Sequence, residues 1–387
     1  MAVSSSEAQY IIESCLTNYR IDGRTKLEHR PYTITNRSTK SKNKTSSSGD
    51  APSSLILSNG SSRIHLPGST TDILCSVKAD LVHPSPSKPN EGVVELGMDL
   101  SLCGGGGTIG GGGGLGSAPK KRRQQRDEES QITSLLQRLV LPHAVNYERL
   151  VIWPGKYVWR LSIDIVVLRC DGCVLDACSI AIREALCSTK LPKVQAVMEG
   201  GNNNDNNGGG GSSKNDLMVD GDFKMATSPA GAEDCPLVIT VSVLSAPPTL
   251  VAGSSGGSGS SKKRHHSISI IDARTEEEAC AASRVCVSVD PSGMVCGVHT
   301  LGGGGVVLDE SENGCGGQSS SMPLAMLGDI VNSAAMASKN LYELLNGDSE
   351  REQDKKTNMK KKNVGTVDYG DDGCGYGYLL KNHFHIQ

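Results

Sequence analysis

One stretch near the middle of the chain, residues 163–182, constrains the fold most strongly. Arg160–Leu168 has few polar breaks, which predicts a strand buried on both faces. Asp171-Gly172 then predicts a tight acidic turn. Leu175–Leu186 is helical in its spacing and places three small or apolar side chains on one face, Cys178, Ile182 and Ala185. A buried strand followed directly by a helix indicates an α/β fold.

Strand and helix patterns along the chain predict two similar βαβ-rich halves, at residues 7–198 and 235–346. Helices are expected behind a Ser6–Gln9 capping box, at Gln131–Val140, and at Leu324–Leu345, where Asn346-Gly347 stops the last one. The remaining segments with apolar alternation are expected strands: Asp72–Val82, Val93–Leu102, Val238–Val243, Ser267–Asp272, Arg284–Val289 and Met294–His299. Asn59-Gly60 predicts a hairpin between Leu55–Leu57 and Arg63–Leu66, and Asp290–Gly293 predicts a turn.

Low-complexity runs interrupt both halves. Such runs bury too little apolar surface to offset the entropy of ordering, so they are expected to be disordered inserts. We place inserts near 38–54 and 103–130 and a disordered tail at 347–387. The most biased runs are Lys40–Ser54, Cys103–Gly116, Gly200–Ser213, Gly253–Ser261 and Gly302–Ser321. Of the 387 residues, roughly 250 remain for packed structure, enough for one large or two small domains.

Composition limits the classes of partner. The formal net charge of -3 excludes a generally basic surface, so any RNA contact must come from a local patch. Aromatic residues make up 3% of the chain, which disfavours base-stacking platforms. No run approaches about 18 continuous apolar residues, so no membrane span is expected. The 13 cysteines lack a framework spacing and are expected to be reduced and mostly buried.

Five motifs in order resemble the RNase PH family, and within it the noncatalytic ring subunits of the RNA exosome. They are Arg20-Ile21-Asp22-Gly23-Arg24, Thr71–Leu74, Lys88–Gly92, Asp272 with Glu276–Glu278, and Leu327–Ile330. The resemblance implies an RNase PH-like fold of the ribosomal-protein-fold superfamily. In active members, the loop between the central strand and helix holds inorganic phosphate and carries Gly-Thr-Arg or Gly-Ser-Arg.

This chain carries Gly172-Cys173-Val174 in that loop, which lacks both the hydroxyl and the guanidinium. Asp171 and Asp176 bracket the helix start instead. A carboxylate about 4 Å from a phosphate costs roughly 1–4 kcal/mol, so we expect the loop to repel this anion. We therefore predict a degenerate phosphate loop and no catalytic residues.

Other departures from the active family point the same way. Gln137-Arg138-Leu139 lacks the two arginines that follow it in active members, and Leu237–Ile271 contains no acidic residue. Asp272 remains as a residual acidic position, and one carboxylate is a poor metal site. We expect neither a metal nor a cofactor. We favour a structural role for Asp272 and Glu276–Glu278, as the N-cap and acidic first turn of a helix.

The candidate RNA-backbone contacts are three arginines, Arg24, Arg138 and Arg160. A surface salt bridge is an equally good interpretation of each. The basic run Pro119–Arg123 is either a nuclear-import signal, a nonspecific RNA arm or a solvated loop. Cys170 and Cys173 have the spacing of a redox pair, although two packed thiols are the better interpretation.

The resemblance implies a structural subunit that helps to close an RNA-threading channel for 3′–5′ RNA processing and degradation, including rRNA maturation. It implies other RNase PH-like ring subunits, cap proteins and RNA as partners, no membrane, and a location in the nucleus, nucleolus and cytoplasm. Two alternatives stay open. One is an active phosphate-dependent 3′–5′ exoribonuclease, and the other is a redox or metal protein built on Cys170 and Cys173.

Overall fold

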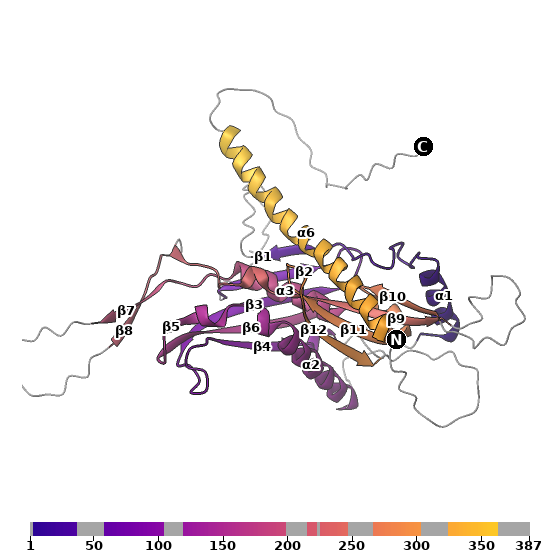
Figure 1. The fold of residues 1–387 in the computed structure, drawn as a ribbon, viewed down its shortest axis with the longest axis horizontal. Helices are drawn as coiled ribbons and strands as arrows, with labels where there is room; N and C mark the ends of the chain where they lie inside the picture. The colour runs from indigo at the N-terminus through magenta and orange to yellow at the C-terminus, as the bar shows by residue number, and fades with distance from the viewer. Residues whose placement is uncertain are drawn as a thin grey trace, which may run out of the picture. The chain divides into compact units, whose positions relative to one another are not determined.

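The computed structural model describes seven ranges of the chain, shown as coloured ribbon in Figure 1. The ranges are 3–36, 58–103, 119–198, 215–222, 225–246, 266–302 and 324–362. Apart from Cys103 and Gly302, the five low-complexity runs named above lie outside the described residues. Residues 1–341 form one compact unit and residues 342–387 form another. Both large sheets belong to the first unit, and a boundary between the predicted halves stays a prediction.

The first sheet has six strands, with the spatial order β1-β2-β3-β6-β4 and with β5 paired to β6. All of its pairs are antiparallel except β4 with β6, which is parallel. The strands are β1 (Thr33–Asn36), β2 (Gly60–His65), β3 (Asp72–Val82), β4 (Val93–Asp99), β5 (Val151–Trp153) and β6 (Tyr157–Arg169).

The central strand β6 shows that one face of this sheet is buried and that the other is partly exposed to solvent. Leu161, Ile163, Ile165 and Val167 are at most 1% exposed. The residues between them, such as Asp164, are half-buried. The prediction that both faces of this strand are fully buried is therefore wrong. Alternate side chains point to opposite faces of a strand, and only one face of this sheet carries the core.

The second sheet is a four-stranded antiparallel sheet with the order β10-β9-β11-β12. Its strands are β9 (Leu237–Ala246), β10 (His266–Ile271), β11 (Ala281–Val289) and β12 (Val295–Gly302). The predicted turn at Asp290–Gly293 joins β11 to β12, with Gly293 at φ +87° and its N–H donating to the Asp290 carbonyl at 3.0 Å. A separate two-stranded sheet pairs β7 (Val194–Met198) with β8 (Asn215–Val219).

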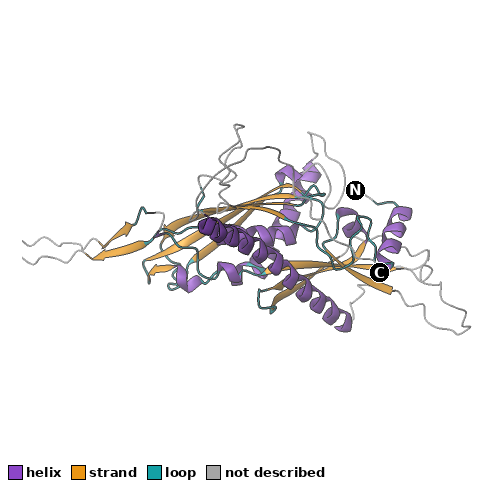
Figure 2. Cartoon of the chain, turned by 90° about the horizontal axis from the view of Figure 1, so that it is seen from above, coloured by secondary structure: helices purple, strands orange, loops and turns teal. Residues whose placement is uncertain are grey.

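Helix α3 (Val174–Ser188) connects the two large sheets, because it contacts β2 and β3 of the first and β9 of the second. Nearly all of its residues are buried. Figure 2 distinguishes the helices from the strands and loops by colour. The other helical segments are α1 (Ser5–Leu16), η1 (Ser101–Cys103), α2 (Pro119–Leu139), η2 (Leu141–His143), η3 (Tyr147–Leu150), η5 (Ala232–Asp234), α5 (Thr275–Cys280) and α6 (Leu324–Lys362).

Several predicted boundaries need correction. The capping box of α1 is formed by Ser4 and Glu7 rather than by Ser6 and Gln9. Helix α2 begins at Pro119 instead of Gln131, and α6 continues past Asn346-Gly347 to Lys362.

The turn predicted at Asn59-Gly60 is also wrong. Gly60 is the first residue of β2, which pairs with β1 and β3, and Leu55–Leu57 lies outside the described residues.

Candidate functional site around the loop before helix α3

The loop between β6 and α3 lies against the segment that leads into α5. Gly172 has φ +75°, and a Cβ added there would lie 2.3 Å from the carbonyl oxygen of Ala273. Only glycine fits such a close backbone approach with a positive φ. Cys173 follows at φ 48° and is the N-cap of α3. The predicted loop residues Gly172, Cys173 and Val174 thus lie at the start of the central helix.

A carboxylate from α5 contacts this helix start. The Cys173 N–H donates to Glu278 Oε1 at 2.8 Å. The other oxygen, Glu278 Oε2, lies 3.6 Å from Arg284 Nη1. Burial raises the pKa of Glu278, although the charge of Arg284 and the Cys173 N–H oppose this shift. The sequence indicates Glu278 only as part of an acidic first turn, because its contact with Cys173 joins residues 105 positions apart.

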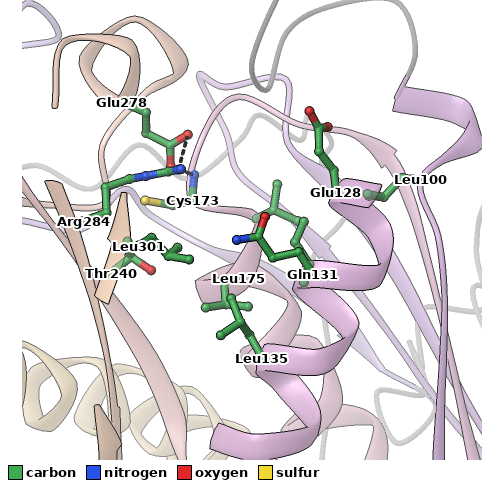
Figure 3. Close-up of a pocket in the computed structure, with 12 residues that line it drawn as sticks. Leu100, Glu128, Gln131, Leu135, Cys173, Leu175, Thr240, Glu278, Arg284 and Leu301 are labelled. Atoms are coloured by element: carbon green, nitrogen blue, oxygen red, sulfur yellow. Dashed lines mark hydrogen bonds and ion pairs between the residues drawn. The ribbon is translucent and has the colours of Figure 1, made fainter. Parts of the chain in front are cut away.

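A cavity of about 80 Å³ opens beside this contact. Figure 3 shows Glu278, Arg284 and Cys173 grouped together, with Leu175 nearby and with Leu135 and Gln131 of α2 beside them. The full lining is Leu100, Glu128, Gln131, Ile132, Leu135, Cys173, Val174, Leu175, Thr240, Glu278, Arg284 and Leu301. The cavity is therefore built from α2, the start of α3, helix α5, the strands β9, β11 and β12, and Leu100, which follows β4.

The Asp176 carboxyl is bonded to strand β9 and does not place a negative charge at the loop, contrary to expectation. It accepts hydrogen bonds from the Thr240 N–H at 2.9 Å and from Thr240 Oγ1 at 2.5 Å. The neighbouring Ser179 hydroxyl accepts from the Val238 N–H at 3.0 Å. Strand β10 pairs with β9 only from residue 241 onward, so these α3 side chains bind N–H groups beyond the end of β10. Burial raises the pKa of Asp176 to about 8, so its carboxyl is largely neutral at pH 7.

Asp171 is also engaged in contacts within the protein. Its Oδ2 lies 3.1 Å from Arg274 Nη2 and 3.7 Å from Arg30 Nη1. Its backbone N–H donates to Thr71 Oγ1 at 2.9 Å. The expectation that Asp171 and Asp176 repel an anion at the loop is therefore wrong, because one is paired with arginines and the other is held neutral.

Asp272 lies at the centre of a buried ionic cluster rather than at a metal site. Its carboxylate accepts from Arg30 Nη2 at 2.5 Å, from the Arg30 N–H at 2.7 Å and from Arg24 Nη1 at 2.9 Å. Burial opposes ionisation of Asp272, but the hydrogen bonds and charge of Arg30, with Arg24, outweigh it and lower its pKa. Asp272 therefore stays ionised deep in the protein.

The predicted N-cap role of Asp272 is wrong. Arg274 is the N-cap of α5, while Glu276, Glu277 and Glu278 do form its acidic first turn, as predicted. Asp272 instead adopts φ 46°, a conformation that aspartate tolerates better than most residues. Glu277 forms a buried ion pair with Arg20, which also donates to the Ile271 and Asp272 carbonyls.

These residues do not offer a site for a divalent cation. The Asp272 carboxylate is already bound by two arginines, which a cation would have to displace. Within the described ranges, no group of three or more His, Cys, Asp or Glu side chains is placed to bind a metal ion. No reaction step through a metal follows from this arrangement.

The three candidate RNA contacts lie in different surroundings. Arg24 is 8% exposed and paired with Asp22 and Asp272. Because its guanidinium is already bound, the structure disagrees with the expectation that Arg24 contacts RNA. Arg160 Nη2 lies 3.2 Å from Asp80 Oδ2 on the partly solvent-exposed face of the first sheet. Arg138 donates to Ser134 Oγ at 3.2 Å, and the described residues give it no acidic partner.

Cys170 and Cys173 are free and buried, as two packed thiols should be. Burial raises the pKa of both thiols. A reactive cysteine needs a lowered pKa and access to solvent, so this geometry disfavours the redox alternative.

Residues 30–192 match the family model described as the 3′ exoribonuclease family, domain 1. The chain is 31% identical over 186 residues to exosome complex component Rrp42 of Sulfurisphaera tokodaii, covering 48% of this chain. It spans 57% of the length of that relative. It is 23% identical over 302 residues to exosome complex component RRP45 of Saccharomyces cerevisiae, covering 78% of this chain and 81% of that protein.

A solved structure shares the fold. It is the Archaeoglobus fulgidus exosome with RNA bound to the active site, which aligns with a TM-score of 0.54 and 19% identity. The alignment covers 87% of this chain and 97% of the other. This likeness confirms the predicted α/β fold. Separately, no helix in the described part of the chain is long and apolar enough to cross a membrane.

Proposed function

We propose that this chain, whose residues 30–192 match the model of the 3′ exoribonuclease family, domain 1, is a non-catalytic structural subunit of an RNA exosome ring. Its partners would be other RNase PH-like ring subunits, cap proteins and RNA. The ring would thread RNA toward 3′–5′ processing and degradation, including rRNA maturation. The relatives that support this proposal are exosome components from an archaeon and from yeast.

One observation carries the non-catalytic part of the proposal. The carboxylates around the loop serve contacts within the protein: Asp171 with Arg274, Asp176 with Thr240, and Asp272 with Arg24 and Arg30. Phosphorolysis requires charge stabilisation of the transferring phosphate, which active sites supply with cationic side chains or metal ions. Gly172, Cys173 and Val174 supply neither a hydroxyl nor a guanidinium for that task.

The proposal is tested with the purified full chain and single-stranded RNA. We expect no phosphate-dependent shortening of the RNA and no release of nucleoside diphosphates, while affinity purification from cells recovers RNase PH-like ring proteins. An archaeal exosome with measured activity is the positive control. Phosphate-dependent release of diphosphates by the chain alone would favour the alternative, an active exoribonuclease.

For RNA contact we propose Arg138 as the main candidate and Arg160 as a weaker one. Arg138 has no acidic partner among the described residues, whereas Arg160 must first leave Asp80. We expect Arg138→Ala in the assembled ring to weaken RNA binding similarly for all sequences and to lower the salt slope by about one unit, because a phosphate contact carries no base information.

Arg160→Ala is the matched control for this measurement. We expect it to lose less RNA affinity, because Arg160 must give up its ion pair with Asp80 before it can bind a phosphate. Binding would be followed by fluorescence anisotropy at several salt concentrations. An unchanged affinity and slope for Arg138→Ala would assign Arg138 to a structural role. A changed preference among sequences would contradict contact through the RNA backbone.

We also propose that the chain acts in the nucleus, the nucleolus and the cytoplasm, as expected for a eukaryotic exosome subunit. The relative from Saccharomyces cerevisiae, matched over 78% of this chain, supports a eukaryotic exosome. Fluorescence microscopy of the tagged full chain checks this proposal, and exclusion from the nucleus would contradict it.

A further inference from the structure

The loop between β3 and β4, residues 83–92, carries a serine that is followed directly by proline. Ser85, Pro86, Ser87 and Lys88 are all exposed. The Ser85 hydroxyl lies 2.9 Å from the Ser87 hydroxyl. The Ser85 carbonyl accepts from the Lys88 N–H at 2.9 Å, which closes a turn with proline at its second position. An exposed loop held by such local bonds opens readily, so an enzyme can reach the Ser85 hydroxyl.

The chain offers a direct comparison, because its sequence contains two serines that precede proline and no threonine that does. The second is Ser228, which is half-buried. Its hydroxyl accepts from Lys190 Nζ at 3.0 Å and donates to a backbone carbonyl at 3.3 Å. Gly231 stands three residues after Ser228, whereas Lys88 stands three residues after Ser85. Ser85 is therefore the more accessible of the two serines and the one with a cation at the third position.

Two features of the loop fit the recognition chemistry of proline-directed protein kinases. These kinases bind the residue after the target serine in an apolar pocket that offers no acceptor to a backbone N–H. Proline has no N–H and loses nothing in that pocket, whereas any other residue leaves a donor unsatisfied. Many of these kinases also prefer a cation three residues after the serine. Pro86 and Lys88 supply both features.

The surroundings of Ser85 favour a phosphorylated side chain. Phosphoserine carries a charge of about -1.5 to -2 at pH 7 and three strong acceptor oxygens. Glu91 is the only acidic residue in the loop sequence 83–92, and its Oε2 lies 2.7 Å from Lys88 Nζ. The Lys88 and Glu91 side chains are 65% and 39% exposed, so this ion pair contributes little stability. A phosphate on Ser85, in the same turn as Lys88, can therefore take the lysine from Glu91.

A second lysine lies on the turn beside this loop. The His83 Nδ1–H donates to the Lys156 carbonyl at 2.7 Å, and the Gly155 N–H donates to the Pro89 carbonyl at 3.2 Å. These bonds fasten both ends of the loop to the turn between β5 and β6. The Lys156 ammonium group lies 4.2 Å from the centre of the Trp153 ring. The loop thus lies beside a second cation, whose charge would offset part of the charge of a phosphate.

The loop also borders a large cavity. Lys88 and Glu91 line it together with Gln137 and Tyr147, and its volume is about 780 Å³. Moving Lys88 onto a phosphate would leave the Glu91 carboxylate without this partner at the edge of the cavity. Phosphorylation would therefore make the cavity edge more negative and disfavour anionic ligands there.

We propose that Ser85 is a phosphorylation site for a proline-directed protein kinase, and that its phosphate binds Lys88 in place of Glu91. The Ser85 Oγ attacks the γ-phosphorus of ATP and forms the Oγ–P bond. The bond between that phosphorus and the β,γ-bridging oxygen breaks, ADP leaves, and the hydroxyl proton passes to the catalytic aspartate of the kinase. This inference goes beyond the proposed function and does not depend on it.

The first test incubates the purified full chain with a cyclin-dependent kinase, magnesium and ATP, and follows phosphate incorporation by mass spectrometry. We expect one phosphate, located on Ser85 by peptide fragmentation, and complete loss of incorporation in Ser85→Ala. Ser228→Ala is the matched control and should incorporate phosphate as the unmodified chain does. Lys88→Ala should slow the reaction, because the cation at the third position is then missing.

Phosphorus NMR tests the contact with Lys88. The second pKa of phosphoserine is ordinarily about 6, and an ammonium group beside the phosphate lowers it, because the cation favours the dianion. We expect a lowered second pKa in the phosphorylated chain. In Lys88→Ala, phosphorylated by longer incubation, it should return toward about 6. Glu91→Ala should keep the second pKa low, because it removes the carboxylate that competes for Lys88.

The inference fails on either of these measurements. Incorporation that persists in Ser85→Ala, or that is absent from the unmodified chain, would show that Ser85 is not the site. A second pKa that Lys88→Ala leaves unchanged would show that the phosphate does not bind Lys88. These failures are distinct from failure of the exosome proposal, which would appear as phosphate-dependent shortening of RNA by the unmodified chain.

Discussion

Replacing Asp272 by alanine lowers the free energy of unfolding by about 3–5 kcal/mol, the range expected when a buried ion pair loses one partner. The variant leaves the guanidinium groups of Arg24 and Arg30 buried without their carboxylate. Arg20 donates to the Asp272 carbonyl, so local rearrangement also disturbs its pair with Glu277. Chemical denaturation followed by circular dichroism gives the free energy directly.

Asp72→Ala is the matched control for this loss. The pair of Asp72 with Arg63 is bidentate, but the arginine side chain is 51% exposed. Exposed pairs contribute little, so the expected loss is at most about 1 kcal/mol. Asp272→Asn separates charge from backbone conformation, because asparagine also tolerates positive φ. Equal losses of unfolding free energy for Asp272→Ala and Asp72→Ala would show that the buried pairs of Asp272 with Arg24 and Arg30 add no more stability than an exposed pair.

The second large effect is a pH dependence caused by Asp176. Its pKa of about 8 in the folded chain lies above the ordinary value of 3.8. Between these values the folded chain keeps a proton that the unfolded chain has lost. Stability from this group is therefore greatest below about pH 4 and falls as the pH rises to about 8, by at most about 1.4 kcal/mol per pH unit.

Asp176→Asn removes this titration while keeping an oxygen for the Thr240 N–H and a donor for the Thr240 hydroxyl. We expect the variant to be as stable as the unmodified chain near pH 4 and more stable near pH 8. Unfolding curves at several pH values measure the difference between the two proteins. If the difference does not change with pH, Asp176 is ionised in the folded chain and the neutral assignment is wrong.

Local patterns were sufficient for the elements that carry the core. Asp72–Val82 was predicted as a strand with the bounds of β3. The helix predicted at Leu175–Leu186 lies within α3. These segments succeed because side-chain alternation and helical spacing are set by the geometry of the backbone itself. The turn predicted at Gly172 is likewise a local feature, because glycine adopts the positive φ found there.

Element ends depended on competition between neighbouring signals. Ser4 and Ser6 can both cap a helix, and only the structure shows that Ser4 does so with Glu7. The Asn346-Gly347 stop signal is a preference worth less than about 1 kcal/mol per residue, and α6 continues through it. Helix α2 likewise extends back to Pro119, into a segment whose composition suggested an insert.

By itself, the sequence predicted the α/β class and the turn and helix start at Gly172–Val174. It could not determine which charges meet there. Cys173 and Glu278 are 105 positions apart, Arg30 and Asp272 are 242 apart, and Arg20 and Glu277 are 257 apart. Pairings over such distances depend on how the two sheets pack around α3. Burial there also decides which carboxyl is ionised, because desolvation acts only once the fold has closed.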